Sequence, residues 1–473
     1  MTTLEFDKPY SGSFWLADTP EVFVPGSLTL TGEWQRLELY GLLTETEKVV
    51  SRNSHEMTLV PADIGNENVT IHGMIANHGR ATLLKSDVNH YSRNLMHSGL
   101  EVQRFVASYA LVGRAHVDGP ETRYSEFQFR ARGLDEWARL QGLSHVINKE
   151  AGHLAISFQH TLGVPAPLRD GSGTVSFELD ASLSPLTVTG SRITNESWVR
   201  INTSVPRTLD QIVNEFAGPL ADLMTLLFGV DCSRDRLKVR DRASGEMLEV
   251  FCYGQRPTGP VDKARPLLYL KEFGLDNFAS WFDVVAKFTP LVQLLGAVVS
   301  EPGRTVQNQL LELASACEGL HRRRSDECRI GADEVSRSLA ILKDSNLDEK
   351  VKGILSDALR IYLWEPSFPQ RMEGLAKDAG TAVPGVSGRT NKWKRAVAEA
   401  RNGFAHSLVS GADPTESILG YVTLTQSLRW LMLGLFLAES GISEQVLGEK
   451  LREYVAYKRF LSDAKERLPE IYR

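Results

Sequence analysis

The chain has 473 residues, which is too long for a single hydrophobic core, so two or three domains are expected. Its 42% hydrophobic and 24% charged residues exclude a largely disordered protein. Its formal net charge of −6 excludes a protein that coats nucleic acid over its whole surface, although a local basic patch is still compatible with it.

The N-terminal stretch MTTLEFDKPY has neither the basic start nor the apolar run of a signal peptide. The most apolar stretches farther along are interrupted by Lys287, Pro290 and Arg429, so we expect no membrane span. The 4 cysteines are scattered and form no CxxC pair, which is typical of reduced thiols. We therefore expect a cytoplasmic protein.

Residues 1–205 are predicted to form a β-rich domain. From about residue 10 they contain short alternating or β-branched runs such as RLELYGLL, NVTIHGMI and GTVSFELDASL. Turn-forming sequences such as VPG, DGSG and SLSPLT separate these runs. The pattern favours an antiparallel sandwich or a barrel-like sheet.

Residues 206–304 are predicted to be a mixed α/β connecting region. A helical pattern covers 208–228, a strand pair lies around 236–253, and another helical pattern covers about 277–299. The sequence SEPGR at 300–304 then indicates a domain boundary.

Residues 305–473 are predicted to form an all-α bundle. Apolar residues recur there at spacings of three and four, first at Val306, Leu310, Leu313, Cys317 and Leu320. The same pattern predicts further helices around 335–342, 351–362, 393–408, 416–439 and 443–461. The expected fold class is therefore α+β multidomain, with a β-rich (sandwich or barrel-like) N-terminal half and a helical bundle at the C-terminus.

The helical half contains the sequence RNGFAH at residues 401–406. On a helix, Asn402 and His406 lie on one side because they are four residues apart, and the long side chain of Arg401 flanks them. Residues 306–473 hold 24 Lys and Arg against 23 Asp and Glu, which leaves a charge of +1 there and −7 in the rest of the chain. A polyanion is therefore tolerated best on this half.

These residue types suit RNA cleavage by the RNA's own 2′-hydroxyl group. A histidine with a pKa near 6.5 can carry protons at neutral pH, and an arginine can donate several hydrogen bonds to phosphate oxygens. The spacing alone is weak evidence, because a chain of this length produces such matches by chance. One other match, RLQGLSH from Arg139 to His145, lies in the β-rich half.

Other residues are weaker candidates for a cleft or for RNA contacts. Glu318, His321 and Arg322 lie on the first bundle helix, where a solvated polar face explains them equally well. A basic stretch, Arg389 with Lys392, Lys394 and Arg395, precedes the motif and serves either RNA contacts or solubility. The spacings of His72, His78, His90 and His97 fit no metal-binding signature, so no metal and no cofactor are expected.

The C-terminal half resembles the HEPN domain, a small helical bundle whose ribonuclease members carry R-x(4–6)-H, often with a polar residue after the arginine. RNGFAH has this form, and LLELASACEGLHRRRSDE and SLRWLMLGLFLAESGIS resemble the first and a closing HEPN helix. SGSFWLADTPEVFVPGSLTL, followed by RLELYGLL, resembles the β-rich N-terminal domain of ApeA-type anti-phage proteins. The two resemblances together cover nearly the whole chain.

The resemblance implies a metal-independent endoribonuclease that leaves a 2′,3′-cyclic phosphate and a 5′-hydroxyl on its RNA, which for this family is tRNA or another RNA of translation. It implies that Arg401 and His406 are catalytic and that Asn402 supports them. It also implies a homodimer through the HEPN domain and a role in abortive infection with a phage-derived trigger. The alternatives are a scaffold or RNA-binding protein with an inactive bundle, and a nucleotide-modifying enzyme built on the β-rich half, for which no phosphate-binding loop is present.

Overall fold

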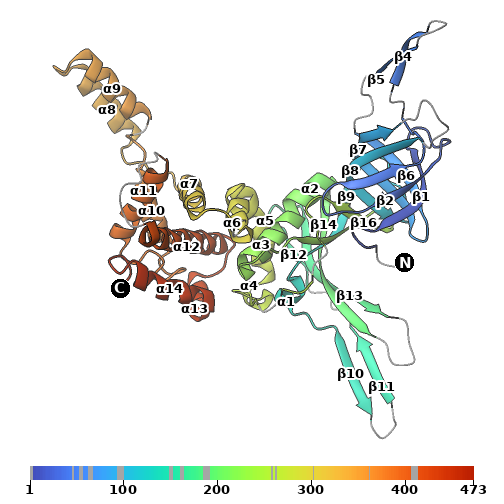
Figure 1. The fold of residues 1–473 in the computed structure, drawn as a ribbon. Helices are drawn as coiled ribbons and strands as arrows, with labels where there is room; N and C mark the ends of the chain where they lie inside the picture. Colours follow the sequence, from blue (N-terminus) through green and yellow to red (C-terminus); the bar gives the residue numbers. More distant parts are fainter. Residues whose placement is uncertain are drawn as a thin grey trace. The chain divides into compact units, whose positions relative to one another are not determined.

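The computed structural model describes residues 4–44, 47–52, 57–61, 68–92, 101–148, 153–159, 164–184, 192–256, 259–261, 264–301, 303–361, 363–405 and 414–473. The chain divides into two compact units. Unit 1 comprises Met1–Phe228 and Cys232–Phe282, and unit 2 comprises Gly229–Asp231 and Asp283–Arg473. Unit 1 contains the strands and unit 2 is helical (Figure 1), which confirms the α+β class expected from the sequence.

One continuous antiparallel sheet runs through unit 1. In the part of the chain that the structure describes, its strand order is β12-β13-β14-β9-β15-β16-β8-β3-β2-β1-β6-β7, and β7 pairs again with β8. The last six strands of this order therefore form a closed ring, which confirms the barrel-like expectation. These six strands are β1 (Pro9–Leu16), β2 (Val24–Thr29), β3 (Gln35–Leu39), β6 (Val69–Ile75), β7 (Gly79–Ser92) and β8 (Val102–Gly113).

The ring encloses a hydrophobic core that follows from the alternation seen in the sequence. In β3, Gln35, Leu37 and Leu39 are buried, while Arg36 and Glu38 alternate with them toward the outside. Phe14 and Phe105 are both essentially inaccessible in the same core. A single-residue shift of a strand would turn this apolar set outward, so burial on one side fixes the register.

The remaining strands of the sheet continue from β8 away from the ring. They are β16 (Met247–Cys252), β15 (Arg234–Arg240), β9 (Tyr124–Ala131), β14 (Ile193–Arg207), β13 (Gly173–Leu183) and β12 (Ala166–Pro167). Separate hairpins are formed by β4 (Glu47–Arg52) with β5 (Met57–Pro61) and by β10 (Leu143–Asn148) with β11 (His153–Phe158). The strand pair expected around 236–253 is thus not a separate connecting piece, because β15 and β16 join β9 to β8 inside one sheet.

The helices of unit 1 pack against its sheet through aromatic side chains. These helices are α1 (Leu134–Ala138), α2 (Leu209–Ile212), the π-helical turn η1 (Val213–Ala217), α3 (Gly218–Phe228), α4 (Leu270–Phe273) and the start of α5 (Leu275–Phe288). Trp137 of α1 lies 5.6 Å, between ring centroids, from Phe278 of α5, and Phe278 lies 5.2 Å from Phe282. Trp137 and Phe278 also lie 5.9 Å and 5.4 Å from Phe177 of β13, so this aromatic cluster ties the helices to the sheet.

The helix expected near 277–299 is two helices rather than one. α5 ends at Phe288 and α6 (Leu291–Ser300) begins after Pro290, because a proline inside a helix removes a hydrogen bond and clashes with the preceding turn. The two are bent by 101°. Among the described helices none is by itself long and apolar enough to cross a membrane, and only this bent pair reaches that length and composition when taken together.

Unit 2 is built around α12 (Pro414–Glu439), which packs against α7 (Val306–Arg324) and several other helices. Around it lie α10 (Phe368–Asp378), α11 (Thr390–Ala405), α13 (Glu444–Glu453) and α14 (Val455–Arg467). Leu428, Leu431 and Phe436 of α12 are inaccessible, as are Leu310 and Leu313 of α7. A helix that is apolar on nearly all sides is typical of the centre of a bundle.

Three details of unit 2 differ from the helices expected from the sequence. The segment expected as one helix over 443–461 contains α13 and α14, which meet at Tyr454. α10 was not anticipated. α8 (Ala332–Lys343) and α9 (Glu349–Ile361) pack mainly against each other and extend away from the other helices of unit 2 (Figure 1). Tyr362 and Leu408, both expected on helices, lie outside the described residues.

Candidate functional site

The first five residues of the motif, 401–405, are the last residues of α11. The packing of this helix against its neighbours holds the start of the motif in place. Trp393, Val397 and Ala400 recur at spacings of four and three and are all buried, as the periodicity indicates. The indole Nε1 of Trp393 donates a hydrogen bond to Ser427 Oγ on α12 at 2.8 Å. These buried contacts fix the orientation of α11, and the motif begins with Arg401 at the edge of the buried face.

Arg401 lies near the end of α11 and is restrained on two sides. Its Nη2 donates a hydrogen bond to Glu318 Oε2 on α7 at 3.0 Å. Its guanidinium carbon lies 4.6 Å from the ring centroid of Phe368, at the start of α10, in a cation–π contact. The side chain keeps 31% of its surface exposed. The guanidinium is therefore oriented by the protein and still open to a ligand.

Arg401 and Glu318 begin a chain of alternating charges that runs from α11 over α7 to the start of α10. The other oxygen of Glu318 accepts a hydrogen bond from Arg322 Nη2 at 3.4 Å. Arg322 Nη1 and Arg371 Nη2 each lie 2.6 Å from Glu365 Oε2. We call the set Arg401, Glu318, Arg322, Glu365 and Arg371 the charge ladder.

His321 closes the ladder at its buried end. Arg371 Nη1 donates to His321 Nδ1 at 3.4 Å, so the remaining ring proton belongs on Nε2. The side chain is only 3% exposed, and burial together with the positive charge of Arg371 lowers the pKa of His321. A Cβ added at Gly374 would lie 2.8 Å from its Nε2, which shows how tightly α10 covers the ring. His321 is thus a buried, neutral residue that contacts the charge ladder through Arg371 and does not lie in an open cleft.

The other residues that the sequence predicted for the site have different surroundings in the structure. Glu318 and Arg322 belong to the ladder, and Lys394 forms an ion pair with Glu373 of α10. Lys392, Arg395 and Asn402 are exposed on α11. His406 lies outside the described residues, which end at Ala405 on this helix. The geometry relating His406 to Arg401 is therefore not part of the structure described.

Three residues that were not predicted from the sequence, Phe368, Glu365 and Arg371, lie on or just before α10. A usable signal was present in SFPQ at residues 367–370. There the Ser367 side chain and Gln370 form a capping box, and a proline occupies the first turn. The ion pairs themselves join residues that are distant in sequence and leave no local pattern.

The second arginine–histidine match has a different environment in unit 1. Arg139 caps the end of α1, its guanidinium lies 3.8 Å from the ring centroid of Tyr269, and it donates to the Tyr269 hydroxyl at 2.7 Å. His145 belongs to strand β10. The two residues thus do not share one helix face.

In the ranges that the structure describes, no group of three or more His, Cys, Asp and Glu side chains could hold a metal ion. Two histidines do meet in the ring of strands, where His72 and His116 stack with centroids 4.4 Å apart. Burial, together with the nearby His72, lowers the pKa of His116 to about 4, so His116 is neutral near pH 7. His97 lies outside the described residues.

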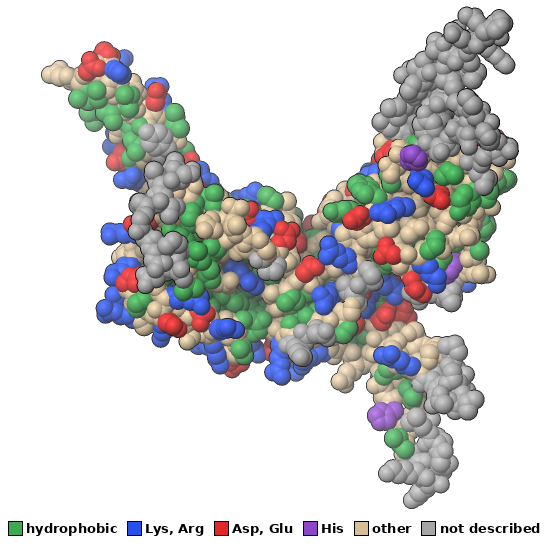
Figure 2. Space-filling model, in the orientation of Figure 1, with side chains coloured by type: hydrophobic (Ala, Val, Ile, Leu, Met, Phe, Trp, Pro, Cys, Tyr) green, Lys and Arg blue, Asp and Glu red, His purple; other side chains and the backbone are tan. Residues whose placement is uncertain are grey.

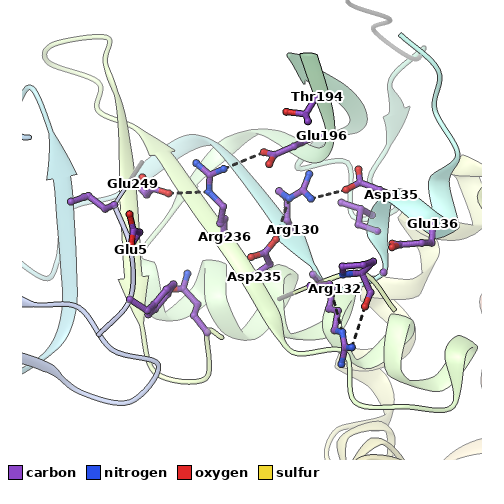
Figure 3. A pocket seen from close by; sticks show the side chains of 18 of the residues that line it. Glu5, Arg130, Arg132, Asp135, Glu136, Thr194, Glu196, Asp235, Arg236 and Glu249 are labelled. Carbon is purple, nitrogen blue, oxygen red and sulfur yellow. Dashed lines mark hydrogen bonds and ion pairs between the residues drawn. The ribbon is translucent and has the colours of Figure 1, made fainter. Parts of the chain in front are cut away.

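Unit 1 contains a charged pocket of about 980 Å³ (Figure 3). Arg130, only 7% exposed, lies 2.8 Å from Asp135 and 3.3 Å from Asp235. Arg236 lies 3.1 Å from Glu196 and 3.0 Å from Glu249. Helix α1 carries Asp135, and strands β9, β14, β15 and β16 carry the others, so the pocket depends on the residues of 206–304 as much as on those before them.

Comparison with known protein families identifies both units. A HEPN domain of the Apea-like type matches residues 311–446, so unit 2 is a HEPN-type helical domain. The family described as ApeA N-terminal domain 1 matches residues 9–282, which is more than half of the chain. The chain therefore belongs to the ApeA family, whose HEPN-type proteins act in anti-phage defence, and the expected architecture is confirmed. No curated protein and no solved structure matches it.

Proposed function

We propose that unit 2 is a metal-independent endoribonuclease whose catalytic groups are Arg401 and His406. The observation that carries the proposal is the restraint on Arg401. Glu318 and Phe368 hold its guanidinium while nearly a third of the side chain stays open, on the helix that leads directly to His406. A cation fixed in advance stabilises developing negative charge without the cost of reorganisation.

The proposed reaction is attack of an RNA 2′-hydroxyl on the adjacent phosphorus. His406 accepts or supplies the proton that moves during the attack. The open edge of the Arg401 guanidinium donates hydrogen bonds to the phosphate oxygens, whose negative charge increases as the fifth bond forms. The bond to the 5′-oxygen then breaks while the protonated His406 gives its proton to that oxygen, which leaves a 2′,3′-cyclic phosphate and a 5′-hydroxyl.

Three exposed residues of α11 support substrate binding in this proposal. Asn402 provides an amide next to Arg401, and Lys392 and Arg395 present positive charge along the same helix. Contacts of this kind recognise the phosphate backbone and not the bases, so they fit tRNA or other structured RNA of translation. Two facing copies of the motif would surround a phosphate better than one, which makes a homodimer part of the proposal.

Unit 1 is proposed to respond to a phage-derived trigger. The charged pocket supports this role, because its arginines and carboxylates offer directional partners to a polar ligand. A cytoplasmic ribonuclease needs such control, since unrestrained cleavage of translation RNA would harm the host.

A binding protein with an inactive bundle is the second candidate function, and one observation favours it. The carboxylate of Glu318 already neutralises Arg401, as an ion pair in a purely structural network would. In that case RNA would bind to the basic face of α11 and remain intact.

The experiment that separates the two functions compares Arg401→Ala and His406→Ala with the wild-type chain on tRNA. Loss of either group is expected to lower the cleavage rate about 10²-fold or more. His145→Ala, in the second match, serves as the control and should cleave normally. Products should carry cyclic phosphate ends, DNA should stay intact because it lacks the 2′-hydroxyl, and EDTA should not inhibit. Full cleavage by a folded His406→Ala protein would refute the assignment.

A further inference from the structure

Unit 1 has a further cavity of about 640 Å³ on the outer surface of its closed ring of strands. Figure 2 shows hydrophobic side chains on the outer surface of this ring, and two large aromatic ones line the cavity. Trp34 is 49% exposed and Tyr40 is 44% exposed. We call this cavity the β3 groove, and its lining includes Ser27, Thr29, Trp34, Arg36, Tyr40 and Arg104.

Strand β3 places the two aromatic side chains on one face. Because the odd-numbered residues of β3 are buried, the even-numbered ones face outward. Trp34 and Tyr40 flank the strand and share this outward face, about 20 Å apart for six residues of extended chain. On the neighbouring strand β2, Ser27 and Thr29 pair in register with the positions between them. The aromatic side chains therefore border a low floor that carries hydroxyl groups.

Two guanidinium groups lie between the aromatic side chains. Arg36 is 65% exposed and forms a loose ion pair with Glu33 at 3.7 Å. Arg104 of β8 lies opposite Glu38 in register, with its Nε 2.6 Å from Glu38 Oε2, and about half of its side chain is exposed. The lining of the β3 groove thus holds two arginines and one carboxylate, whereas the lining of the charged pocket holds four arginines and six carboxylates. Of these two cavities, the β3 groove suits an anionic ligand better.

We propose that the β3 groove binds single-stranded nucleic acid, with bases stacked on its two aromatic side chains and phosphates bound by its two arginines. Every base has an aromatic face, so stacking accepts any sequence but requires unpaired bases. Small barrels bind single strands from about four nucleotides upward, which suits two stacking positions about 20 Å apart. Ser27 and Thr29 offer hydroxyl groups to the sugars and phosphates between them. The proposal concerns unit 1 alone and does not rest on the nuclease assignment of unit 2.

A proline-rich peptide is another ligand that aromatic grooves bind. Its neutral proline rings can pack on Trp34 and Tyr40, but they offer no negative charge to Arg36 or Arg104. A nucleic acid strand uses both kinds of side chain at once, because bases and phosphates alternate along it. The combination of aromatic and guanidinium groups therefore favours the nucleic acid.

The test is fluorescence anisotropy of the full chain with a labelled oligothymidylate about 12 nucleotides long, which lacks the 2′-hydroxyl and so resists the proposed cleavage. Trp34→Ala with Tyr40→Ala should raise Kd about 30-fold or more, since each stacked base contributes a factor of about five or more. Phe23→Ala is the matched control. It removes an aromatic side chain that is 61% exposed and does not line the groove, so Kd should stay at the wild-type value. These positions are exposed, and circular dichroism checks that the fold is kept.

The salt dependence of binding tests the phosphate contacts separately. Arg36→Ala should weaken binding and reduce the slope of log Kd against log salt concentration by about 0.7, the value for one phosphate contact on a single strand. Arg114→Ala is the control, because Arg114 is 68% exposed, pairs with Glu246 at 3.4 Å and lies outside the groove lining. Its slope should equal that of the wild type.

Photo-cross-linking of the same oligonucleotide, with 5-iodouracil in place of thymine, locates the site. Cross-links should map to Trp34 or Tyr40. An oligonucleotide that does not bind, an unchanged Kd in the double variant, or cross-links confined to α11 would overturn the proposal, and the last result would leave the nuclease assignment intact. Binding of a labelled oligoproline peptide in place of the oligonucleotide would assign the groove to a peptide instead.

Discussion

Arg401 is restrained by one ion pair and one aromatic face, and the two contacts have different consequences. Phe368 covers one face of the guanidinium and leaves its edges free. Glu318 occupies one edge and links it through Arg322 to the rest of the charge ladder. Because a partly exposed ion pair adds little stability, the main effect of the Glu318–Arg401 pair is to fix the direction of the Arg401 guanidinium. Glu318 is in this sense a positioning residue.

Glu318→Gln should therefore separate the orientation of the Arg401 guanidinium from its attraction for RNA. The loss of negative charge next to Arg401 should leave RNA affinity unchanged or higher, while the less restrained guanidinium should lower kcat about ten-fold or more. Glu312→Gln, on the same helix but paired with Arg304, is the matched control and should alter neither quantity. Single-turnover cleavage and filter-binding titrations give the two values. A loss of affinity with unchanged kcat would contradict the positioning role.

At the scale of elements, the helices of unit 2 show what a periodic pattern can and cannot predict. The apolar spacing in α7 and α11 correctly indicated their buried faces, because those faces pack within the unit. The same kind of spacing in α8 and α9 correctly indicated helices but not their surroundings, since a pattern identifies an apolar face without saying what covers it. α10 was not predicted, although Met372, Leu375 and Ala376 recur at helical spacing and its capping box was visible.

Two helical glycines of unit 2, Gly434 on α12 and Gly353 on α9, should differ in how their replacement changes stability. A Cβ added at Gly434 would lie 2.0 Å from Val383 Cγ2, and Val383 is inaccessible and stiff. Gly434→Ala should therefore lower the free energy of unfolding by about 1–3 kcal/mol. Gly353→Ala, with open space around it on α9, should instead be neutral or stabilising by up to about 1 kcal/mol. Urea unfolding of the two variants checks this, and equal stability would show that α12 can shift.

At the scale of the whole molecule, the boundary between the units follows from strand pairing. The sequence signals at 205 and at 300–304 mark changes in local pattern: β14 ends at Arg207, and the second signal lies between helices α6 and α7. Local pattern does not reveal that β15 and β16 lie between β9 and β8, because the pairing partners are more than a hundred residues away. Unit 1 consequently extends to Phe282.

Two truncations test this boundary. A chain beginning at residue 206 keeps β15 and β16 but loses β9 and β8, so the buried faces of Leu237 and Val250 and the unpaired strand edges become exposed. A chain beginning at residue 283 retains the helices of unit 2 without these strands. We expect the longer fragment to aggregate and to be cut rapidly by protease, and the shorter one to stay soluble and resistant. Equal resistance of the two fragments would contradict the single sheet. If the shorter fragment folds, comparing its RNA cleavage with that of the full chain tests the proposed control by unit 1, free of the effects of a broken core.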